Sequence, residues 1–404
     1  MTSKEMYDAA VVGAGSSGMV SALLLSRAGL RVALVGPEPG QDHRTFALMD
    51  APVQMLKRLG VWDACAGQAA PLEKLCIIDE TGRALRAPTV TFSAIEIGIE
   101  AFAWNIPAAD LNAALMERVS EDKAIEVVRD SVETCSQIED NAEIQLTSGN
   151  RLKTRLIVGA DGRQSRAREA AGIQSDLWEY PQTAIVLRIR HSRPHGNLST
   201  EFHRPSGPFT LVPLAGNQSA IVLVETPKRA EVLRAMSDAE FTEELERLSH
   251  RMLGRITVDG PRGAYPLSVL APRRFAAGRT ALVGEAAHVF PPIGAQGLNL
   301  GLRDAAVLSE IIADHNTDPG GLDVIEAYND ARSADIRLRT TAVDLLNRSL
   351  LSSFVGFQAG RAAGMALMES LPALRKALMR EGMAPAAASL PEIMRRDELL
   401  EAVH

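Results

Sequence analysis

The stretch that decides the fold is Asp8-Ala-Ala-Val-Val-Gly-Ala-Gly-Ser-Ser-Gly18, in which an apolar run leads into three spaced glycines. The apolar run predicts a strand over residues 8–12. Residues 19–28 predict a helix that ends at Gly29, and Arg31-Val-Ala-Leu-Val35 predicts a second strand. Strand, turn, helix and strand in this order indicate a βαβ unit of a parallel sheet.

The three glycines have the spacing of a dinucleotide-binding turn. Gly13 allows the tight turn, Gly15 lets the backbone approach a pyrophosphate, and Gly18 permits close packing of the helix. The helix N-terminus adds about half a positive charge toward the phosphates. The alternative is a glycine-rich turn with a structural role alone. The cofactor-binding residues expected in this turn are Gly13, Ala14, Gly15, Ser17 and Gly18.

The end of the second strand departs from the usual pattern. An acid normally ends this strand and accepts the ribose hydroxyls of the dinucleotide. Here Gly36 follows Val35, and the nearest acid is Glu38. Either Glu38 reaches the ribose from a displaced loop, or Glu38 is solvated and the backbone and water take its place.

A second motif, Gly159-Ala-Asp-Gly162, follows the apolar strand-like residues 156–158. This position is the carboxyl end of a strand, where open α/β sheets bind ligands. We therefore expect Asp161 to accept hydrogen bonds from sugar hydroxyls. The alternative is an ordinary Asp-Gly turn, since this pair is common in turns.

The most informative segment is Leu282-Val-Gly-Glu-Ala-Ala-His-Val-Phe-Pro-Pro-Ile-Gly-Ala-Gln-Gly-Leu-Asn-Leu-Gly-Leu-Arg-Asp304. A glycine-rich loop that leads into a helix presents backbone N–H groups and the positive end of the helix dipole, which together stabilise negative charge. Asn299 adds a side-chain amide donor. His288, which precedes a Pro-Pro turn, is more typical of a packed or loop-fixing residue than of a proton-transfer residue.

Charge and cysteine content exclude several classes of function. The net charge of -7 and the lack of a Lys/Arg run argue against a nucleic-acid partner. The three cysteines, Cys65, Cys76 and Cys135, show no metal-binding spacing, so we expect no metal site and a reducing compartment, the cytoplasm by default. No apolar run reaches transmembrane length, which leaves only peripheral contact with a membrane.

In this order, the motifs resemble those of the flavoprotein aromatic hydroxylases of the para-hydroxybenzoate hydroxylase fold. The resemblance is most specific to the UbiH/UbiF-type hydroxylases of ubiquinone biosynthesis and covers roughly residues 6–345. It rests on Gly13 to Gly18, Asp42-x-Arg44, Gly159 to Gly162, and Gly284-x-Ala-Ala-His288 through Asn299.

The resemblance implies FAD as the cofactor and NAD(P)H as the co-substrate. Gly284 and Glu285 would contact the ribityl and pyrophosphate region, Asp161 would serve both FAD and NAD(P)H, and Arg44 would lie beside the flavin ring. The family normally has Asp where this chain has Glu285, so that contact shifts or passes through water. The residues expected around the ring are Pro292, Gly294, Gly297, Leu298 and Asn299.

The resemblance also implies the chemistry. NAD(P)H reduces FAD, dioxygen adds to the flavin ring, and the resulting hydroperoxide hydroxylates an electron-rich aromatic ring. Arg44 and Pro292 are the residues expected next to this reaction. Since the expected substrate strands contain no cation obviously committed to a carboxylate, a small apolar phenol, polyprenylated as in quinone precursors, is the favoured substrate.

The fold class expected is α/β with an additional sheet, made of a Rossmann-like FAD-binding domain and an interleaved β-sheet substrate domain. The FAD-binding domain is assigned to residues 1–75, 100–175 and 265–345, and the substrate domain to residues 76–99 and 176–264. Residues 346–404 form a C-terminal helical region. Its segment 350–368, with the basic residues Arg375, Lys376 and Arg380 beyond it, would contact a membrane surface or a biosynthetic complex, or pack on its own chain.

Two rival functions stay open at this stage. Phe102-Ala-Trp-Asn-Ile-Pro107 is similar to the WxWxIP segment of flavin-dependent halogenases, with Phe at the first Trp. The second rival is a non-catalytic FAD-binding module of a biosynthetic complex, since cofactor binding does not prove turnover. The Asp-Gly motif, which suits NAD(P)H use, favours the hydroxylase.

Overall fold

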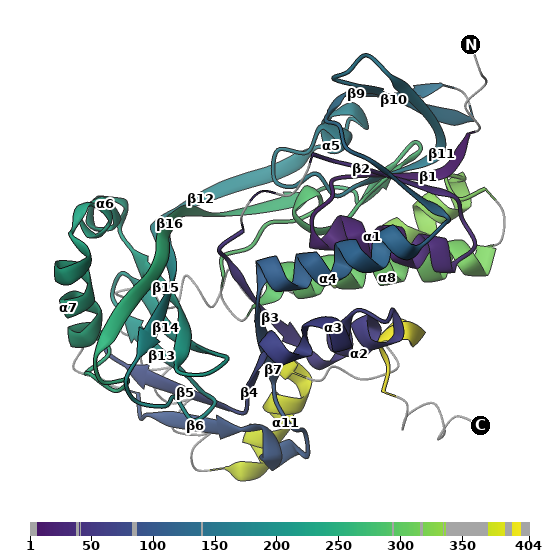
Figure 1. Cartoon of the computed structure of the whole chain (residues 1–404). Helices are drawn as coiled ribbons and strands as arrows, with labels where there is room; N and C mark the ends of the chain where they lie inside the picture. Colours follow the sequence, from purple (N-terminus) through teal and green to yellow (C-terminus); the bar gives the residue numbers. More distant parts are fainter. Residues whose placement is uncertain are drawn as a thin grey trace.

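The computed structural model describes residues 6–37, 40, 42–82, 87–138, 140–292, 295–315, 318–333, 335–336, 371–383 and 390–396. These residues form an eight-stranded sheet, a seven-stranded sheet and a three-stranded sheet, with helices packed against them (Figure 1). Strands and helices both contribute large shares of the chain, which confirms the α/β class with an additional sheet.

The chain opens with the βαβ unit that the glycine pattern predicts. It consists of β1 (Tyr7–Val12), α1 (Ser16–Arg27) and β2 (Val32–Val35). The helix begins three residues earlier than expected, because Gly15 stands at its N-cap in an extended conformation. All four residues of β2 are buried, as in a parallel strand that is covered on both faces.

The eight-stranded sheet has the order β17-β18-β11-β1-β2-β8, and β10 and β9 continue from β11. Its other strands are β8 (Ile125–Val128), β9 (Val132–Ile138), β10 (Asn141–Leu146), β11 (Arg151–Gly159), β17 (Ala276–Ala277) and β18 (Thr280–Leu282). Strands β18, β11, β1, β2 and β8 run parallel, so their carboxyl ends meet at one edge. Helices α1, α4 (Ala108–Glu121) and α8 (Gln296–His315) lie side by side along this sheet (Figure 1).

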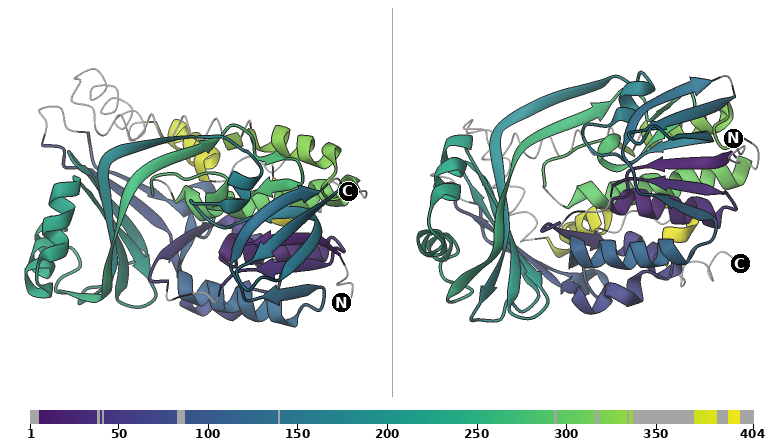
Figure 2. Two further views of the ribbon diagram at one scale, coloured as in Figure 1. Left: turned by 90° about the horizontal axis from the view of Figure 1, so that it is seen from above. Right: turned by 45° about the horizontal axis from the view of Figure 1, so that its top comes forward.

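The seven-stranded sheet has the order β16-β12-β15-β14-β13-β5-β6 and is antiparallel except between β13 and β5. Its strands are β5 (Lys74–Asp79), β6 (Val90–Ser93), β12 (Ser175–His191), β13 (Leu198–Arg204), β14 (Gly207–Leu214), β15 (Gln218–Glu225) and β16 (Ile256–Pro272). Helices α6 (Pro227–Ala235) and α7 (Asp238–Leu248) cover its outer face (Figure 2). Phe202, Phe209 and Phe241 are fully buried in this layer.

A small antiparallel sheet of β3 (Thr45–Met49), β7 (Ala103–Pro107) and β4 (Ala70–Leu72) connects the two larger ones. The Asn105 amide of β7 donates a hydrogen bond to the Pro213 carbonyl of β14 (2.9 Å). Trp104 packs edge-on against Trp62, with 6.0 Å between ring centroids, beside α2 (Asp50–Arg58) and α3 (Trp62–Cys65). The segment that is similar to halogenases is therefore part of the core here.

The proposed division into domains stays a prediction. The strands of the seven-stranded sheet fall between residues 74 and 93 and between 175 and 272, and β16 runs past the assigned boundary at residue 264. Of the C-terminal region, the structure describes α11 (Pro372–Met383) and a short 3-10 turn at Glu392–Met394, and segment 350–368 lies outside the described residues. Within the described part of the chain, no helix has the length and apolar character needed to span a membrane.

Candidate functional site

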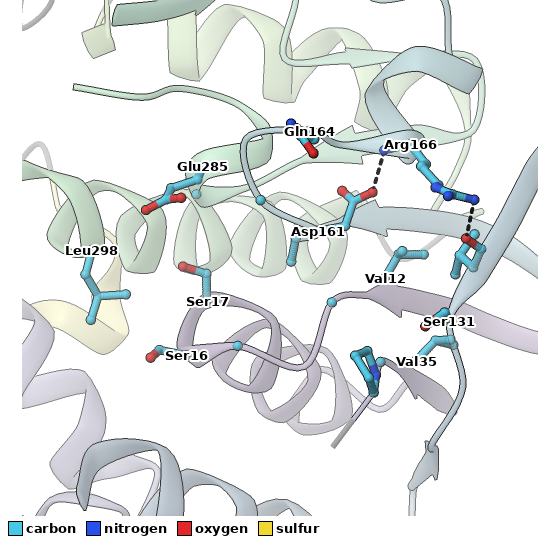
Figure 3. A pocket seen from close by; sticks show the side chains of 18 of the residues that line it. Val12, Ser16, Ser17, Val35, Ser131, Asp161, Gln164, Arg166, Glu285 and Leu298 are labelled. Carbon is cyan, nitrogen blue, oxygen red and sulfur yellow. Dashed lines mark hydrogen bonds between the residues drawn. The ribbon is translucent and has the colours of Figure 1, made fainter. Parts of the chain in front are cut away.

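A cavity of about 540 Å³ lies at the carboxyl ends of the parallel strands. This volume is within the range of cofactor sites. Figure 3 shows side chains from separate segments around it, among them Ser17 at the start of α1, Asp161 after β11 and Glu285 after β18. The sequence-predicted residues that line the cavity are Gly13, Gly15, Ser17, Arg44, Asp161, Gly284, Glu285, Gly297 and Leu298.

The three glycines of the first turn differ in what a side chain would meet. A Cβ at Gly15 would have no heavy atom within 4 Å, so this residue leaves open space in the cavity wall. A Cβ at Gly13, whose φ is +112°, would lie 2.3 Å from the Ala160 carbonyl oxygen, and one at Gly18 would lie 1.8 Å from the Gly13 carbonyl oxygen. Gly13 and Gly18 therefore allow close packing, and Gly15 gives a ligand access to the backbone.

The two glycine-rich segments of the chain meet directly beside the cavity. A Cβ at Gly284, whose φ is +61°, would lie 2.8 Å from Ser17 Oγ. A Cβ at Gly301 of α8 would lie 2.7 Å from the same Ser17 Oγ and 2.8 Å from Gly284 Cα. The absence of side chains at both glycines brings the starts of α1 and α8 together, so that two helix N-termini face one cavity.

A buried network fixes the turn that starts at Gly284. Asp304 Oδ2 accepts the Gly284 backbone N–H (3.0 Å) and lies 2.7 Å from His288 Nε2. Asp304 Oδ1 accepts from Arg332 Nε (2.8 Å), and Arg332 lies in the helical segment 322–333. Burial acts to raise the pKa of Asp304, but the neighbouring charges of His288 and Arg332 and the hydrogen bonds outweigh it and hold the pKa below its ordinary value. His288 thus holds the loop, in agreement with the packed interpretation.

Asp161 lines the cavity, but its carboxylate is engaged within its own loop. Oδ1 accepts from Ser165 Oγ (2.5 Å), and Oδ2 accepts the backbone N–H groups of Arg166 (2.7 Å) and Ala167 (3.1 Å). These bonds cap the short helix α5 (Arg166–Ala170) (Figure 3). Both the turn interpretation and the ligand interpretation of Asp161 are therefore compatible with its position.

Arg168 joins the two loops that line the cavity. Its Nη2 donates to the Arg163 carbonyl of the Asp161 loop (2.8 Å), and its Nη1 donates to the Ala286 carbonyl of the Gly284 turn (2.8 Å). Burial lowers the pKa of the Arg168 guanidinium, although nearby Asp161 and Glu169 act in the opposite direction. The relative position of the two loops therefore depends on a side chain that no sequence motif indicated.

Arg44 lies between the cavity and the seven-stranded sheet. Asp42 accepts hydrogen bonds from Arg44 Nε (3.0 Å) and Nη2 (2.8 Å), and Glu285 Oε1 lies 3.7 Å from Arg44 Nη1. Arg44 also lines a second cavity, of about 350 Å³, together with Val186 of β12 and Tyr265 of β16. The guanidinium thus stands where the cofactor cavity meets the face of the other sheet.

Several predicted residues lie elsewhere or serve another purpose. The Asn299 amide was expected to face the ligand, but it donates to the carbonyls of Ala47 (2.8 Å) and Ala295 (2.6 Å) and accepts the Met49 N–H (2.8 Å), so it fixes β3 to α8. Pro292 is exposed and does not line the cavity. Ala14 and Gly18 pack behind the cavity wall. Glu38 and Gly294 lie outside the described residues.

The cavity has further lining residues that were not among the predicted site residues, among them Ser16, Gly36, Phe46, Asp130, Ser131, Gln164 and Arg166. Ser16 Oγ donates to Asn112 Oδ1 of α4 (2.6 Å). Asp130 and Ser131 follow β8, which pairs with β2 in parallel. The signal available in the sequence was the short run Ile-Glu-Val-Val at 125–128. The pairing of this strand with β2 places the residues that follow it, Asp130 and Ser131, in the cavity wall.

These features fit an extended dinucleotide. The cavity has an open glycine at Gly15, two helix N-termini for phosphate charge, and polar side chains at both ends. The family model described as an FAD binding domain matches residues 6–341. The chain belongs to this FAD-binding family.

Curated relatives match over nearly the whole chain. The ubiquinone hydroxylase UbiL of Rhodospirillum rubrum is 31% identical over 390 residues, which cover 94% of this chain and 90% of the relative. The 3-demethoxyubiquinol 3-hydroxylase of Escherichia coli is 27% identical, over 92% of this chain and 97% of the relative. The chain is accordingly an FAD-dependent monooxygenase, and NAD(P)H use is typical of such enzymes.

Solved structures show the same fold at lower identity. The p-nitrophenol 4-monooxygenase PnpA of Pseudomonas putida has a TM-score of 0.74 at 20% identity and covers 93% of this chain and 97% of its own. Klebsiella pneumoniae HpxO, solved with FAD and uric acid, has a TM-score of 0.74 at 17% identity and covers 95% of this chain and 97% of its own.

Proposed function

We propose that this monooxygenase hydroxylates an apolar phenolic ring, that of a polyprenylated quinone precursor, in ubiquinone biosynthesis. The observation that carries the proposal is the match over 94% of the chain to a relative named as a ubiquinone hydroxylase. The name of the Rhodospirillum rubrum relative gives no ring position, whereas the Escherichia coli relative is a 3-hydroxylase, so the proposal is for the class of substrate.

The face of the seven-stranded sheet opposite α6 and α7 supports an apolar substrate. Successive residues of a strand point to opposite faces, and Ile185 and Leu187 pack with the helices, so Ala184 and Val186 point the other way. Ala184 packs there in an apolar cluster with Val224 and Leu267. Val186, which packs against this cluster, also lines the cavity beside Arg44. A prenylated ring would find apolar contacts next to the proposed flavin ring site.

FAD, when bound, accepts electrons from NAD(P)H and activates dioxygen. We propose that the chain's own part is to hold the ligands, exclude water and stabilise negative charge. Arg44 and the N-terminus of α8 would supply positive potential near the ring. Gly297 and Leu298 would lie beside it, and Gly284 and Glu285 would hold the ribityl and pyrophosphate region. The residues proposed to bind the adenosine diphosphate half are Gly13, Gly15, Ser17 and Asp161, with Ala14 and Gly18 packed behind them, and Glu38 is one of the candidate acceptors for the adenosine ribose.

The test is turnover by the purified FAD-loaded protein. A polyprenylated phenol should accelerate NADH or NADPH oxidation and take one oxygen atom from isotopically labelled dioxygen. Halide-dependent product would favour the halogenase instead. FAD retention without oxygenated product from any prenylated phenol would favour the non-catalytic module.

A pair of variants tests the substrate face. Val186→Asn should raise KM for the prenylated phenol, because a polar amide would meet an apolar substrate. Val232→Asn makes the same change on the outer helix α6, where Val232 is 46% exposed, and should leave KM unchanged. Equal KM values for both variants would contradict the placement of the substrate.

We further propose peripheral contact between the C-terminal region and the inner face of the cytoplasmic membrane or a biosynthetic complex. Part of this region packs on its own chain, since Met379 of α11 is buried near Phe92 and Phe102 and Arg375 Nη2 lies 2.5 Å from Glu96 Oε2. Lys376 and Arg380 remain as candidate contacts for anionic lipid. Charge reversal of these two residues should weaken flotation with phosphatidylglycerol vesicles, and unchanged flotation would contradict lipid contact at α11.

A further inference from the structure

The end of β2 has no acid for the adenosine ribose, and the structure shows why it cannot have one directly after the strand. A Cβ at Gly36 would lie 2.7 Å from the Ala14 backbone nitrogen and 2.8 Å from Ala14 Cβ. An acidic side chain at position 36 would therefore push against the turn that carries Gly13 and Gly15. The ribose hydroxyls need an acceptor from another element.

The neighbouring strand β8 brings an acid to the same place. Val35 of β2 pairs in parallel with Val128 of β8, and the Gly36 N–H donates to the Val128 carbonyl (3.1 Å). Asp130 follows β8 by two residues and lines the cavity together with Gly36, Pro37 and Ser131. Figure 3 shows Ser131 close to Val35 at this end of the cavity.

The carboxylate of Asp130 is oriented by its own surroundings. Oδ1 accepts hydrogen bonds from the Ser131 N–H (2.7 Å) and Thr147 Oγ1 (2.6 Å), and Oδ2 accepts a long bond from the Ser148 N–H (3.3 Å). Hydrogen bonds from Ser148 and Thr147 lower the pKa of Asp130 to about 2, so the group is ionised at neutral pH. Each carboxylate oxygen has two lone pairs, so Oδ2 can accept a further donor.

Asp161, the other acid expected at the ribose, is less suited to the role. Its two oxygens already accept three hydrogen bonds at 3.1 Å or less, and these bonds cap α5. A ribose hydroxyl would compete with them. The bond that Asp130 Oδ2 accepts from the Ser148 N–H is longer, at 3.3 Å, and its other Ser148 donor is a side-chain hydroxyl, so a ribose hydroxyl would displace weaker or more adjustable donors than at Asp161.

We propose that Asp130 accepts a hydrogen bond from a hydroxyl of the adenosine ribose of FAD, in place of the acid that usually ends the second strand. The acceptor for the ribose therefore follows β8 and not β2, because the tight contact between Gly36 and Ala14 leaves no room for an acidic side chain directly after β2. Asp130 is therefore a binding residue for the adenosine half and has no part in the chemistry at the flavin ring.

The test measures the affinity of the apoprotein for FAD, with the quenching of flavin fluorescence as the signal. The ligands are FAD and analogues that lack either the 2′- or the 3′-hydroxyl of the adenosine ribose. Asp130→Asn should weaken FAD binding about tenfold, as expected for a hydrogen bond to a charged acceptor. With one of the two analogues the wild-type protein and this variant should bind equally. If Asp130→Asn lost the same factor of affinity for FAD and for both analogues, or lost no affinity for FAD, the proposal would be overturned.

Asp122→Asn is the matched control. Asp122 stands at the opposite end of β8, where its Oδ1 accepts the Ala124 N–H (3.0 Å), and it does not line the cavity. This control should bind FAD as the wild type does. Because Asp130→Asn could loosen its loop, Thr147→Val provides a second variant that keeps the carboxylate and removes one orienting bond. Thr147→Val should weaken FAD binding by a smaller factor than Asp130→Asn. Its effect should again be smaller with the analogue that the wild type and Asp130→Asn bind equally.

Glu38→Gln is the competing variant. If the analogue-dependent loss occurs with Glu38→Gln and not with Asp130→Asn, the ribose acceptor is Glu38 and the proposal is wrong. The proposal is supported if Glu38→Gln binds FAD with wild-type affinity and Asp130→Asn binds FAD more weakly. These outcomes leave the proposed hydroxylase activity untouched, since they concern only the adenosine half.

Discussion

The eight-stranded sheet and the seven-stranded sheet form their sides of the site in different ways. The parallel strands end in loops, and the backbone of these loops, with helix N-termini behind it, lines the cofactor cavity. The antiparallel sheet instead presents side chains from the middle of its strands, such as Val186. The first surface depends on glycines and main-chain geometry, and the second depends on which side chain each strand carries.

This difference indicates how each region tolerates change. A cofactor common to many enzymes is held by backbone groups that most side-chain substitutions leave in place. Substrate contacts made by side chains can vary without disturbing the fold. The comparison predicts that core substitutions in either sheet cost stability, whereas FAD affinity responds only to changes in the first.

The largest effect is expected at the buried carboxylate behind the Gly284 turn. Asp304→Ala leaves Arg332 and His288 buried without their anion and should lower the free energy of unfolding by about 3 to 5 kcal/mol. It should also abolish FAD retention, because the Gly284 N–H loses its acceptor. Urea unfolding and flavin content measure the two effects. Asp314→Ala, an exposed position of the same helix, should change neither.

The Asp304 carboxylate also makes the free energy of unfolding depend on pH. The pKa of Asp304 in the folded protein is below the ordinary value of 3.8, so the unfolded chain binds the proton more readily. Its contribution to stability is present above about pH 4 and is lost as the pH falls through the folded pKa. The loss of stability below pH 4 should therefore be steeper for the wild type than for Asp304→Ala. Parallel curves would show that Asp304 is not the responsible carboxylate.

A core change in the other sheet should separate stability from cofactor binding. Phe241 of α7 is fully buried against the seven-stranded sheet, with the Arg262 guanidinium 4.3 Å from its ring centroid. Phe241→Ala should lower the free energy of unfolding by about 3 to 4 kcal/mol through the cavity it leaves. The Kd for FAD at a temperature where the protein is folded should stay unchanged. A weakened Kd would mean that the two regions are coupled.

Two glycine variants distinguish the packing role of Gly18 from the role of Gly15, which gives a ligand access to the backbone of the first turn. Gly18→Ala places a methyl group against the Gly13 carbonyl and should cost about 2 to 3 kcal/mol of stability, with loss of FAD. Gly15→Ala places the same group in open space, so stability should hold while FAD binding weakens. Thermal melting of the apoproteins and FAD titration distinguish them, and equal melting temperatures would contradict the packing role of Gly18.

A small effect on stability is expected at Arg44, whose side chain is 45% exposed and paired with Asp42. Arg44→Gln should change the free energy of unfolding by less than about 1 kcal/mol, because exposed ion pairs contribute little. Reoxidation and reduction rates of the bound flavin should nevertheless change if Arg44 lies beside the ring. Wild-type rates in stopped-flow absorbance would remove Arg44 from the catalytic residues.

The sequence by itself determined the βαβ start, the α/β class and the FAD family, because spaced glycines and buried apolar strands act over a few neighbouring residues. Only the tertiary structure decided that Asn299 holds β3, that Arg168 joins two loops, and that Asp130 lies beside Gly36. Each of these contacts joins residues far apart in the chain, where strand pairing and helix packing, not local spacing, set the distance.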